Sequence, residues 1–108
     1  VLDNPFGEEL NPQSMVEFKQ LNVYPTKYLS KNLSKDTAIE RSEPVRSRLL
    51  SIAKDLNVDV IDPIEFLCDT NSCPKFSEDG HLLYKDYDHL SVEATKSNAS
   101  YIFRILEP

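Results

Sequence analysis

Long apolar stretches are missing from this sequence of 108 residues. Its uncharged apolar runs fall far short of the ~20 residues that a membrane-spanning helix needs, which excludes such a helix. A charged and then apolar secretory signal is missing too, and the first residue is valine rather than methionine. Because Val1-Leu2 runs directly into Asp3-Asn4-Pro5, as at the end of a strand, we expect the chain to be part of a longer protein.

An excess of positive charge is also missing. The chain has 12 Lys and Arg residues against 18 Asp and Glu residues, which gives a formal net charge of −6. Binding to a phosphate backbone requires clustered positive charge, so we expect no nucleic acid as a partner. The closest basic cluster is Arg41, Arg46 and Arg48, which we interpret as the solvated face of a helix.

Cysteine and glycine are scarce, with two of each. Cys68 and Cys73 have no second pair with which to complete a four-ligand metal site. A disulfide between them would close the loop of residues 69–72, with Pro74 stiffening its exit, and would place the protein outside the reducing cytoplasm. Two unrelated buried thiols are the alternative. Gly7 is expected to mark a turn that needs the backbone freedom of glycine.

The clearest predicted element is a helix that has Ser42 as its N-cap and ends near Asn57. A β-branched strand over residues 58–61 follows it and ends at Asp62-Pro63. A helix that leads through a tight connection into an apolar strand is typical of an α/β domain with a mostly parallel sheet. The apolar positions that define the helix are Val45, Leu49, Ile52 and Leu56.

Weaker patterns flank this unit. A short helix is predicted from Pro12 to about Leu21, and residues 22–41 form either an irregular arm or another short helix. A last helix is predicted after Ser91, which is a suitable N-cap. The apolar residues of these three segments are, in order, Met15, Phe18 and Leu21, then Tyr24, Tyr28, Leu29 and Leu33, and finally Val92, Ala99, Ile102, Phe103 and Leu106.

Residues 62–90 form a long connection that contains the candidate chemistry. Asp86 lies three residues before His89, so its carboxylate can accept the proton on one imidazole nitrogen and leave the other nitrogen as a general base. Asp88 is a rival partner, but adjacent side chains in an extended loop point apart. These three side chains could instead bind a divalent ion, although their spacing matches no closed metal loop, and we expect no metal or cofactor. His81 is expected in an exposed turn.

The stretch between residues 61 and 91 contains, in order, Asp62-Pro63, the cysteine pair, Asp79-Gly80, Leu83-Tyr84 and Asp86-Tyr87-Asp88-His89-Leu90-Ser91. This stretch resembles the last conserved block of SGNH hydrolase-like domains. The resemblance is greatest to the extracytoplasmic SGNH domain fused to membrane-bound acyltransferases that O-acetylate cell-surface polysaccharides. The opening run Leu2-Asp3-Asn4-Pro5-Phe6-Gly7-Glu8 is similar to a segment that these domains carry after a central strand.

The resemblance implies that Asp86 and His89 are the acid and base of a Ser-His-Asp triad and that Cys68 and Cys73 are joined. It implies a three-layer α/β/α, flavodoxin-like fold with a parallel sheet, of which residues 1–108 are the carboxy-terminal part. The implied function is transfer of an acyl group, expected to be acetyl, to or from polysaccharide hydroxyls in the periplasm or at the cell surface. The implied partners are an acyl donor, a carbohydrate acceptor, the amino-terminal half of the same domain and an upstream membrane acyltransferase domain.

The sequence also departs from the family pattern. It has no Gly-Asp-Ser nucleophile motif and no match to the glycine and asparagine that supply the oxyanion hole, so we expect this chain alone to be inactive. Tyr84 and Tyr87 are candidates for a wall against a sugar ring, although packing explains each more simply. The alternative function is a non-catalytic, degenerate SGNH-like module that binds a carbohydrate or a partner protein.

Overall fold

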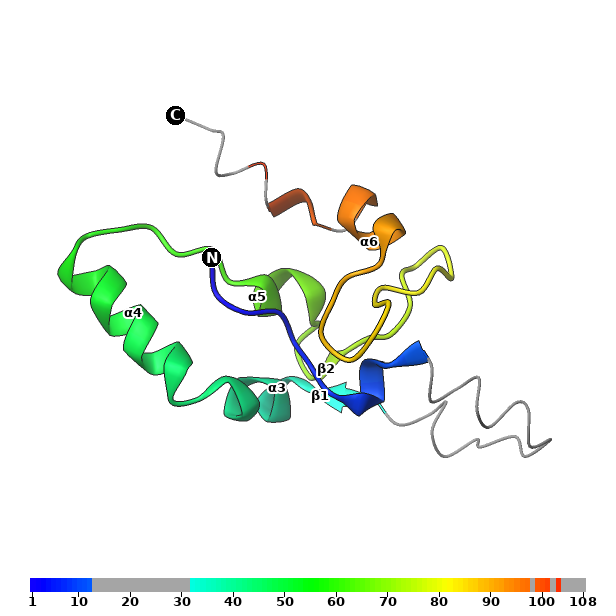
Figure 1. The fold of residues 1–108 in the computed structure, drawn as a ribbon, viewed down its shortest axis with the longest axis horizontal. Helices are drawn as coiled ribbons and strands as arrows, with labels where there is room; N and C mark the ends of the chain where they lie inside the picture. Colours follow the sequence, from blue (N-terminus) through cyan, green and yellow to red (C-terminus); the bar gives the residue numbers. More distant parts are fainter. Residues whose placement is uncertain (13–31, 98, 102, 104–108) are drawn as a thin grey trace.

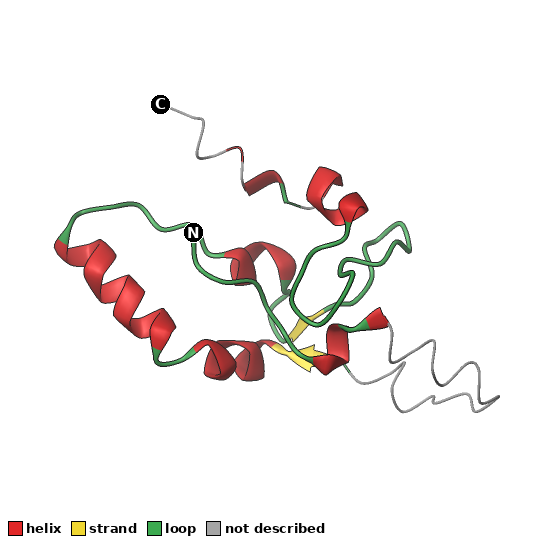
Figure 2. Cartoon of the chain, in the orientation of Figure 1, coloured by secondary structure: helices red, strands yellow, loops and turns green. Residues whose placement is uncertain are grey.

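The computed structural model describes residues 1–12, 32–97, 99–101 and 103. Figures 1 and 2 show that loops make up much of the chain between helix α4 (Val45–Asp55) and helix α6 (Val92–Ser97). The described elements are the 3-10 helix η1 (Glu8–Leu10), strand β1 (Leu33–Ser34), helices α3 (Lys35–Ser42), α4 (Val45–Asp55) and α5 (Pro63–Leu67), strand β2 (Ser72–Cys73) and helix α6 (Val92–Ser97).

Strands β1 and β2 form a two-stranded antiparallel sheet, the sheet found within the described ranges. Its register places Leu33 opposite Cys73 and Ser34 opposite Ser72. Helices together with this small sheet agree with an α/β chain. The three-layer parallel sheet stays a prediction.

Cys68 and Cys73 form the expected disulfide, which attaches strand β2 to the end of α5. Inside the closed loop, Asp69 Oδ1 accepts hydrogen bonds from the backbone N–H groups of Asn71 and Ser72, at 2.8 and 2.7 Å. Those two bonds lower the pKa of Asp69, the Ser72 N–H contributing most. The loop is therefore fixed both by a covalent bond and by local turn chemistry.

Helix α3 has Ser34 as its N-cap, because Ser34 Oγ accepts a hydrogen bond from the Thr37 N–H at 3.1 Å. The prediction that Ser42 caps the following helix is wrong. Ser42 is the last residue of α3, and its hydroxyl donates to the carbonyl oxygen of Ile39 at 2.8 Å. Helix α4 begins only at Val45, with Pro44 rather than Ser42 at the N-cap position and no side-chain hydrogen bond capping it.

Helix α4 confirms the predicted helix and its end near Asn57, which has a left-handed φ of 54° as is common after a helix. Its apolar face, however, is not buried. The exposed fractions are 62% for Val45, 43% for Leu49, 45% for Ile52 and 69% for Leu56. Figure 1 shows α4 displaced from the centre, where the N-terminal segment, α5 and the small sheet lie.

Residues 58–61 follow α4 without forming the predicted strand. Val58 and Val60 are exposed, and the backbone bond that reaches this stretch from the N-terminal segment runs from the Leu2 N–H to the Ile61 carbonyl oxygen, 2.9 Å. A strand requires a row of such bonds to a neighbouring chain segment. Within the described residues no neighbouring strand supplies that row, so the strand prediction is wrong here.

The core forms around Ile64 of α5 and Tyr84, both of which are essentially fully buried. Asp62 positions α5, since its Oδ1 accepts a hydrogen bond from the Ile64 N–H at 3.1 Å, and Pro63 takes the first helical position. The remaining buried members of this cluster are Leu10, Leu33, Ala38, Cys73, Leu83 and Ala94. The core thus joins both ends of the described sequence to the long connection.

Two of the three arginines expected on a solvated face are in ion pairs. Arg46 of α4 binds the carboxylate of Asp62, the residue that caps α5, and Arg41 of α3 binds Glu9. Arg48 is exposed as expected. The basic cluster therefore connects α3 and α4 to other parts of the chain.

Near the carboxyl end, Ser91 caps α6 as predicted, because its Oγ accepts a hydrogen bond from the Ala94 N–H at 3.0 Å. Ala99 is buried, whereas Val92 and Phe103 are exposed. None of the helices in the described ranges has the length and apolarity required to cross a bilayer. Several predicted apolar positions lie outside the described residues: Met15, Phe18, Leu21, Tyr24, Tyr28, Leu29, Ile102 and Leu106.

Candidate active site

The loop that carries Asp86 and His89 is closed at its base. Tyr84 and Leu90 form an isolated antiparallel bridge, and the Lys85 N–H donates to the His89 carbonyl oxygen at 2.9 Å. Tyr84 is buried in the core, so the loop begins from a fixed point. The site loop, defined here as residues 84–90, is therefore an ordered loop.

Asp86 folds the site loop from inside. Its Oδ1 accepts hydrogen bonds from the backbone N–H groups of Asp88 and His89, at 2.9 and 2.7 Å. This arrangement is the turn that an aspartate side chain makes with the backbone that follows it. The bond from the Asp88 N–H is the largest of the effects that lower the pKa of Asp86 to about 2, and the bonds from His89 add to it. Asp86 is therefore ionised at neutral pH.

The same carboxylate orients the imidazole of His89. His89 Nδ1 lies 2.9 Å from Asp86 Oδ2 and 3.1 Å from Asp86 Oδ1. Because an ionised carboxylate only accepts hydrogen bonds, we assign the proton of the neutral imidazole to Nδ1, which leaves Nε2 as a proton acceptor. The His89 side chain is 64% exposed, so a substrate or a nucleophile from another segment can approach it.

Asp88 does not point away from His89, and the expectation that it would is wrong. Its Oδ1 lies 2.7 Å from His89 Nδ1, although in a direction that makes no hydrogen bond, since this oxygen has no hydrogen-bond partner in the described part of the chain. The expectation assumed an extended loop, whereas the turn made by Asp86 brings consecutive side chains to one side. Asp88 thus adds negative charge beside Nδ1, while Asp86 supplies the directional bonds.

The three side chains also bring ligand atoms within 4.8 Å of one another, as a site for a divalent cation would require. A cation on Nδ1 would replace the proton that this nitrogen donates to Asp86. The hydrogen bonds of Asp86 are satisfied by the loop itself, so the geometry needs no ion to explain it.

No serine hydroxyl in the described part of the chain hydrogen-bonds to His89. The nearest serine in sequence, Ser91, donates its hydroxyl to the Leu82 carbonyl oxygen at 2.6 Å and caps α6. The chain also has no Gly-Asp-Ser motif. The site loop therefore presents a carboxylate hydrogen-bonded to an imidazole, and the described residues place no serine hydroxyl against that imidazole.

The structure separates the two tyrosines that were candidates for a sugar-binding wall. Tyr84 is 1% exposed, and burial raises the pKa of its phenol, so it cannot form such a wall. Tyr87 is 50% exposed and lies between Asp86 and His89 in sequence, so it remains a candidate. His81 is exposed, as expected, and takes no part in the site.

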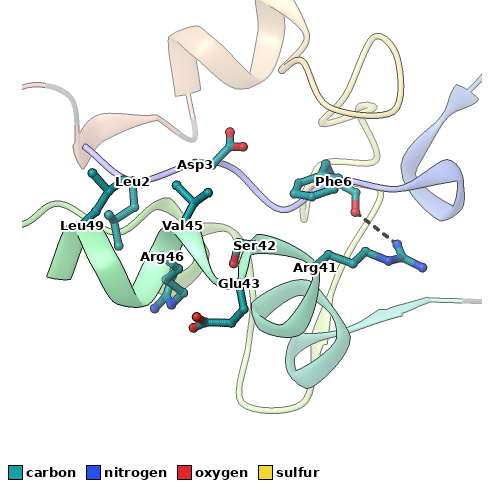
Figure 3. Close-up of a pocket in the computed structure, with 9 residues that line it drawn as sticks. All are labelled: Leu2, Asp3, Phe6, Arg41, Ser42, Glu43, Val45, Arg46 and Leu49. Carbon is teal, nitrogen blue, oxygen red and sulfur yellow. Dashed lines mark hydrogen bonds between the residues drawn. The ribbon is translucent and has the colours of Figure 1, made fainter. Parts of the chain in front are cut away.

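Two cavities lie outside the site loop. One, of about 250 Å³, is lined by the N-terminal segment together with α3 and α4, as Figure 3 shows. The other, of about 390 Å³, lies beside the disulfide and is lined by residues that include Phe66 and Phe76. Neither of these two is lined by Asp86 or His89.

Sequence reasoning missed the contacts that the site loop makes with the N-terminal segment. The Gly7 N–H donates to the Tyr87 carbonyl oxygen at 2.8 Å, and Asn4 Nδ2 donates to the Asp88 carbonyl oxygen at 3.4 Å. The partners in the second bond are 84 positions apart, so no local pattern could reveal the contact. The scarcity of glycine was the one available signal, and it pointed correctly to Gly7.

Comparison with known protein families identifies the chain as similar to a described domain. A family model described as "SGNH domain (fused to AT3 domains)" matches residues 3–102. No curated protein and no solved structure matches the chain.

Proposed function

Because that model covers nearly the whole chain, the chain belongs to the SGNH domains that are fused to AT3 domains, and we propose that it supplies the acid and base of a Ser-His-Asp triad. The reaction proposed is acyl transfer to or from carbohydrate hydroxyls. The observation that supports it is the bond between Asp86 Oδ2 and His89 Nδ1, at 2.9 Å, on an imidazole whose other nitrogen is free to act as a base.

In the proposed reaction, a serine hydroxyl attacks the carbonyl carbon of an acyl donor while His89 Nε2 accepts its proton. That proton passes to the leaving group of the donor, and an acyl-serine remains. A sugar hydroxyl or water then attacks the acyl-serine, again giving its proton to Nε2. Nε2 passes this proton to the serine oxygen as the acyl–oxygen bond breaks, so the ester or free acid leaves and the serine hydroxyl is restored. Asp86 stays ionised throughout and stabilises the imidazolium that forms in each step.

The serine is proposed to come from another segment, since these 108 residues contain no Gly-Asp-Ser. We propose the amino-terminal half of the same domain as its source and a membrane acyltransferase domain upstream of it. The disulfide between Cys68 and Cys73 supports a location in an oxidising compartment, in the periplasm or at the cell surface. Acetyl is the proposed acyl group, and Tyr87 is a candidate contact for the acceptor sugar.

Activity of variants in a protein that joins this chain to the serine segment tests the proposal. We expect Asp86→Asn to lower kcat for acetyl-ester hydrolysis by about 10⁴-fold and His89→Ala to lower it by about 10⁶-fold, as loss of the corresponding triad members does elsewhere. Asp88→Asn, which removes charge but no hydrogen bond, should cost about tenfold or less. Arg48→Gln, on the exposed surface of α4, serves as the control. Full activity of His89→Ala would show that this imidazole is not the base.

A non-catalytic module is the second candidate, and the missing Gly-Asp-Ser motif is the observation that favours it. In that case His89 would have no nucleophile to activate. A parent protein without an upstream Gly-Asp-Ser, together with saturable binding of a polysaccharide fragment that His89→Ala leaves unchanged, would support this reading over the enzyme.

A further inference from the structure

The N-terminal segment, residues 1–10, lies directly against the backbone of the site loop. Gly7 and Asn4 donate hydrogen bonds to the carbonyl oxygens of Tyr87 and Asp88, the two residues between the acid and the base. The Asp86 carboxylate binds N–H groups of the site loop, whereas the N-terminal segment binds its carbonyl oxygens. The two sets of hydrogen bonds therefore use different backbone groups of the same turn. The site loop is therefore held both by the Asp86 side chain within it and by the distant N-terminal segment.

Arg41 of α3 holds the N-terminal segment in turn. Its Nη1 and Nη2 donate to the two carboxylate oxygens of Glu9, each at 2.8 Å, and Nη1 also donates to the Phe6 carbonyl oxygen at 3.2 Å. Figure 3 shows the last of these bonds, with the segment crossing over α3 and α4. A bidentate guanidinium–carboxylate pair fixes direction as well as distance, which a lysine cannot do.

Gly7 makes this arrangement possible. Its φ of 154° and ψ of 162° belong to a region that is open essentially to glycine alone. A Cβ added at this position would overlap Nη1 of Arg41 and Oε2 of Glu9. The guanidinium thus occupies the space that any other side chain would need, and the Gly7 N–H stays directed at the Tyr87 carbonyl oxygen.

We propose that Arg41 and Gly7 are positioning residues for the Asp86–His89 pair. The proposed coupling consists of consecutive contacts. The Arg41 guanidinium binds Glu9 and the Phe6 carbonyl oxygen, and the backbone continues from Phe6 to Gly7. The Gly7 N–H then binds the Tyr87 carbonyl oxygen of the site loop. The inference rests on the proposed function only in regarding the pair as catalytic. The mechanical coupling is a property of this chain alone.

NMR of the ¹⁵N-labelled chain, which requires neither serine nor substrate, tests the coupling. In Arg41→Gln we expect the amides of Gly7, Asp88 and His89 to exchange about five- to tenfold faster, the effect of losing a hydrogen bond of ordinary net strength. The ring ¹⁵N shifts of His89 should report a smaller share of the Nδ1–H tautomer. Arg48→Gln, the matched control, should leave all of these signals unchanged, and the amide of Cys68, the residue that follows α5, should be unaffected by either change.

Gly7→Ala keeps every charge and should reproduce the Arg41→Gln result through steric overlap and backbone strain. If both variants accelerate exchange at Gly7 but leave Asp88, His89 and the His89 ring unchanged, the proposal is wrong and Asp86 alone holds the loop. Should Arg41→Gln not fold, Arg41→Lys decides by the same signals, with an intermediate change expected. In the protein with its serine, full activity of His89→Ala would overturn the proposed function of the pair and leave the coupling standing. Loss of activity in His89→Ala together with full activity in Arg41→Gln would instead show that Arg41 does not position the pair for the reaction.

Discussion

Helix α4 and the connection over residues 62–91 contrast in regularity and in burial. Helix α4 is the most regular element in the sequence, yet its apolar side chains are exposed in this structure. The connection has little regular secondary structure, yet it contributes Ile64, Cys73, Leu83 and Tyr84 to the core, all 3% exposed or less. Regular periodicity therefore predicts what a segment forms, and not how much apolar surface it buries.

The difference also shows how an irregular segment becomes ordered. In the connection, carboxylates and hydroxyls take over the hydrogen bonding that a helix or sheet supplies elsewhere. Backbone N–H groups a few positions further along the chain donate hydrogen bonds to the side-chain oxygens of Asp69, Asp86 and Ser91. Ordered turns of this kind suit a site, because they hold side chains in place while leaving them exposed to solvent.

The largest expected effect is on the core. Ile64→Ala should lower the free energy of unfolding by about 2–5 kcal/mol, since it opens a cavity around a fully buried side chain. Ile52→Ala, the matched change on the exposed face of α4, should alter it by no more than about 0.5 kcal/mol. Urea unfolding followed by circular dichroism measures both. Equal costs would mean that the face of α4 is buried in solution.

Removal of the disulfide should have the next largest effect. Replacing Cys68 and Cys73 together with serine opens a small loop, for which chain entropy predicts a loss of about 2 kcal/mol. The site loop should keep its shape at temperatures where the chain stays folded, because Asp86 acts within that loop. A loss of the Asp88 and His89 amide protection under those conditions would contradict the independence of the two turns.

Acid should weaken the connection before it affects α4. Folding lowers the pKa values of Asp86 and Asp69, so the unfolded chain takes up these protons first. Their contribution to stability is complete above about pH 5 and is lost as the pH falls below the ordinary carboxyl pKa, for Asp86 through about 2. Melting temperatures between pH 5 and 2 measure this loss, and Asp86→Asn should make the curve flatter. If Asp86→Asn leaves the dependence of the melting temperature on pH unchanged, the turn made by Asp86 adds nothing to stability.

The smallest effect is expected at Tyr84. Its hydroxyl is buried without a hydrogen-bond partner in the described residues. Tyr84→Phe removes a polar group that folding leaves unsatisfied, and it should leave the free energy of unfolding unchanged or raise it by about 1 kcal/mol. Thermal unfolding decides this, with Tyr87→Phe as the exposed control. A clear destabilisation would reveal a partner for the hydroxyl.

Rules that relate residues close together in the sequence were enough to predict single turns and helices. The cap at Ser91, the end of α4 and the Asp86–His89 contact all depend on residues a few positions apart, and the structure has each of them. The strand over residues 58–61 could not be judged this way, because a strand exists only if another segment pairs with it. The approach of Asp88 to His89 depended on a backbone turn that the sequence interpretation took to be extended.

One carboxylate, that of Asp86, both shapes the site loop and orients the base. The loop requires this residue whether or not the proposed reaction takes place, so the presence of Asp86 alone says little about activity. His89 is different, since within the described residues the polar contacts of its side chain are with Asp86 and Asp88, and 64% of the side chain is exposed. The histidine could therefore change without loss of the loop, and its loss would mark the loss of the proposed reaction.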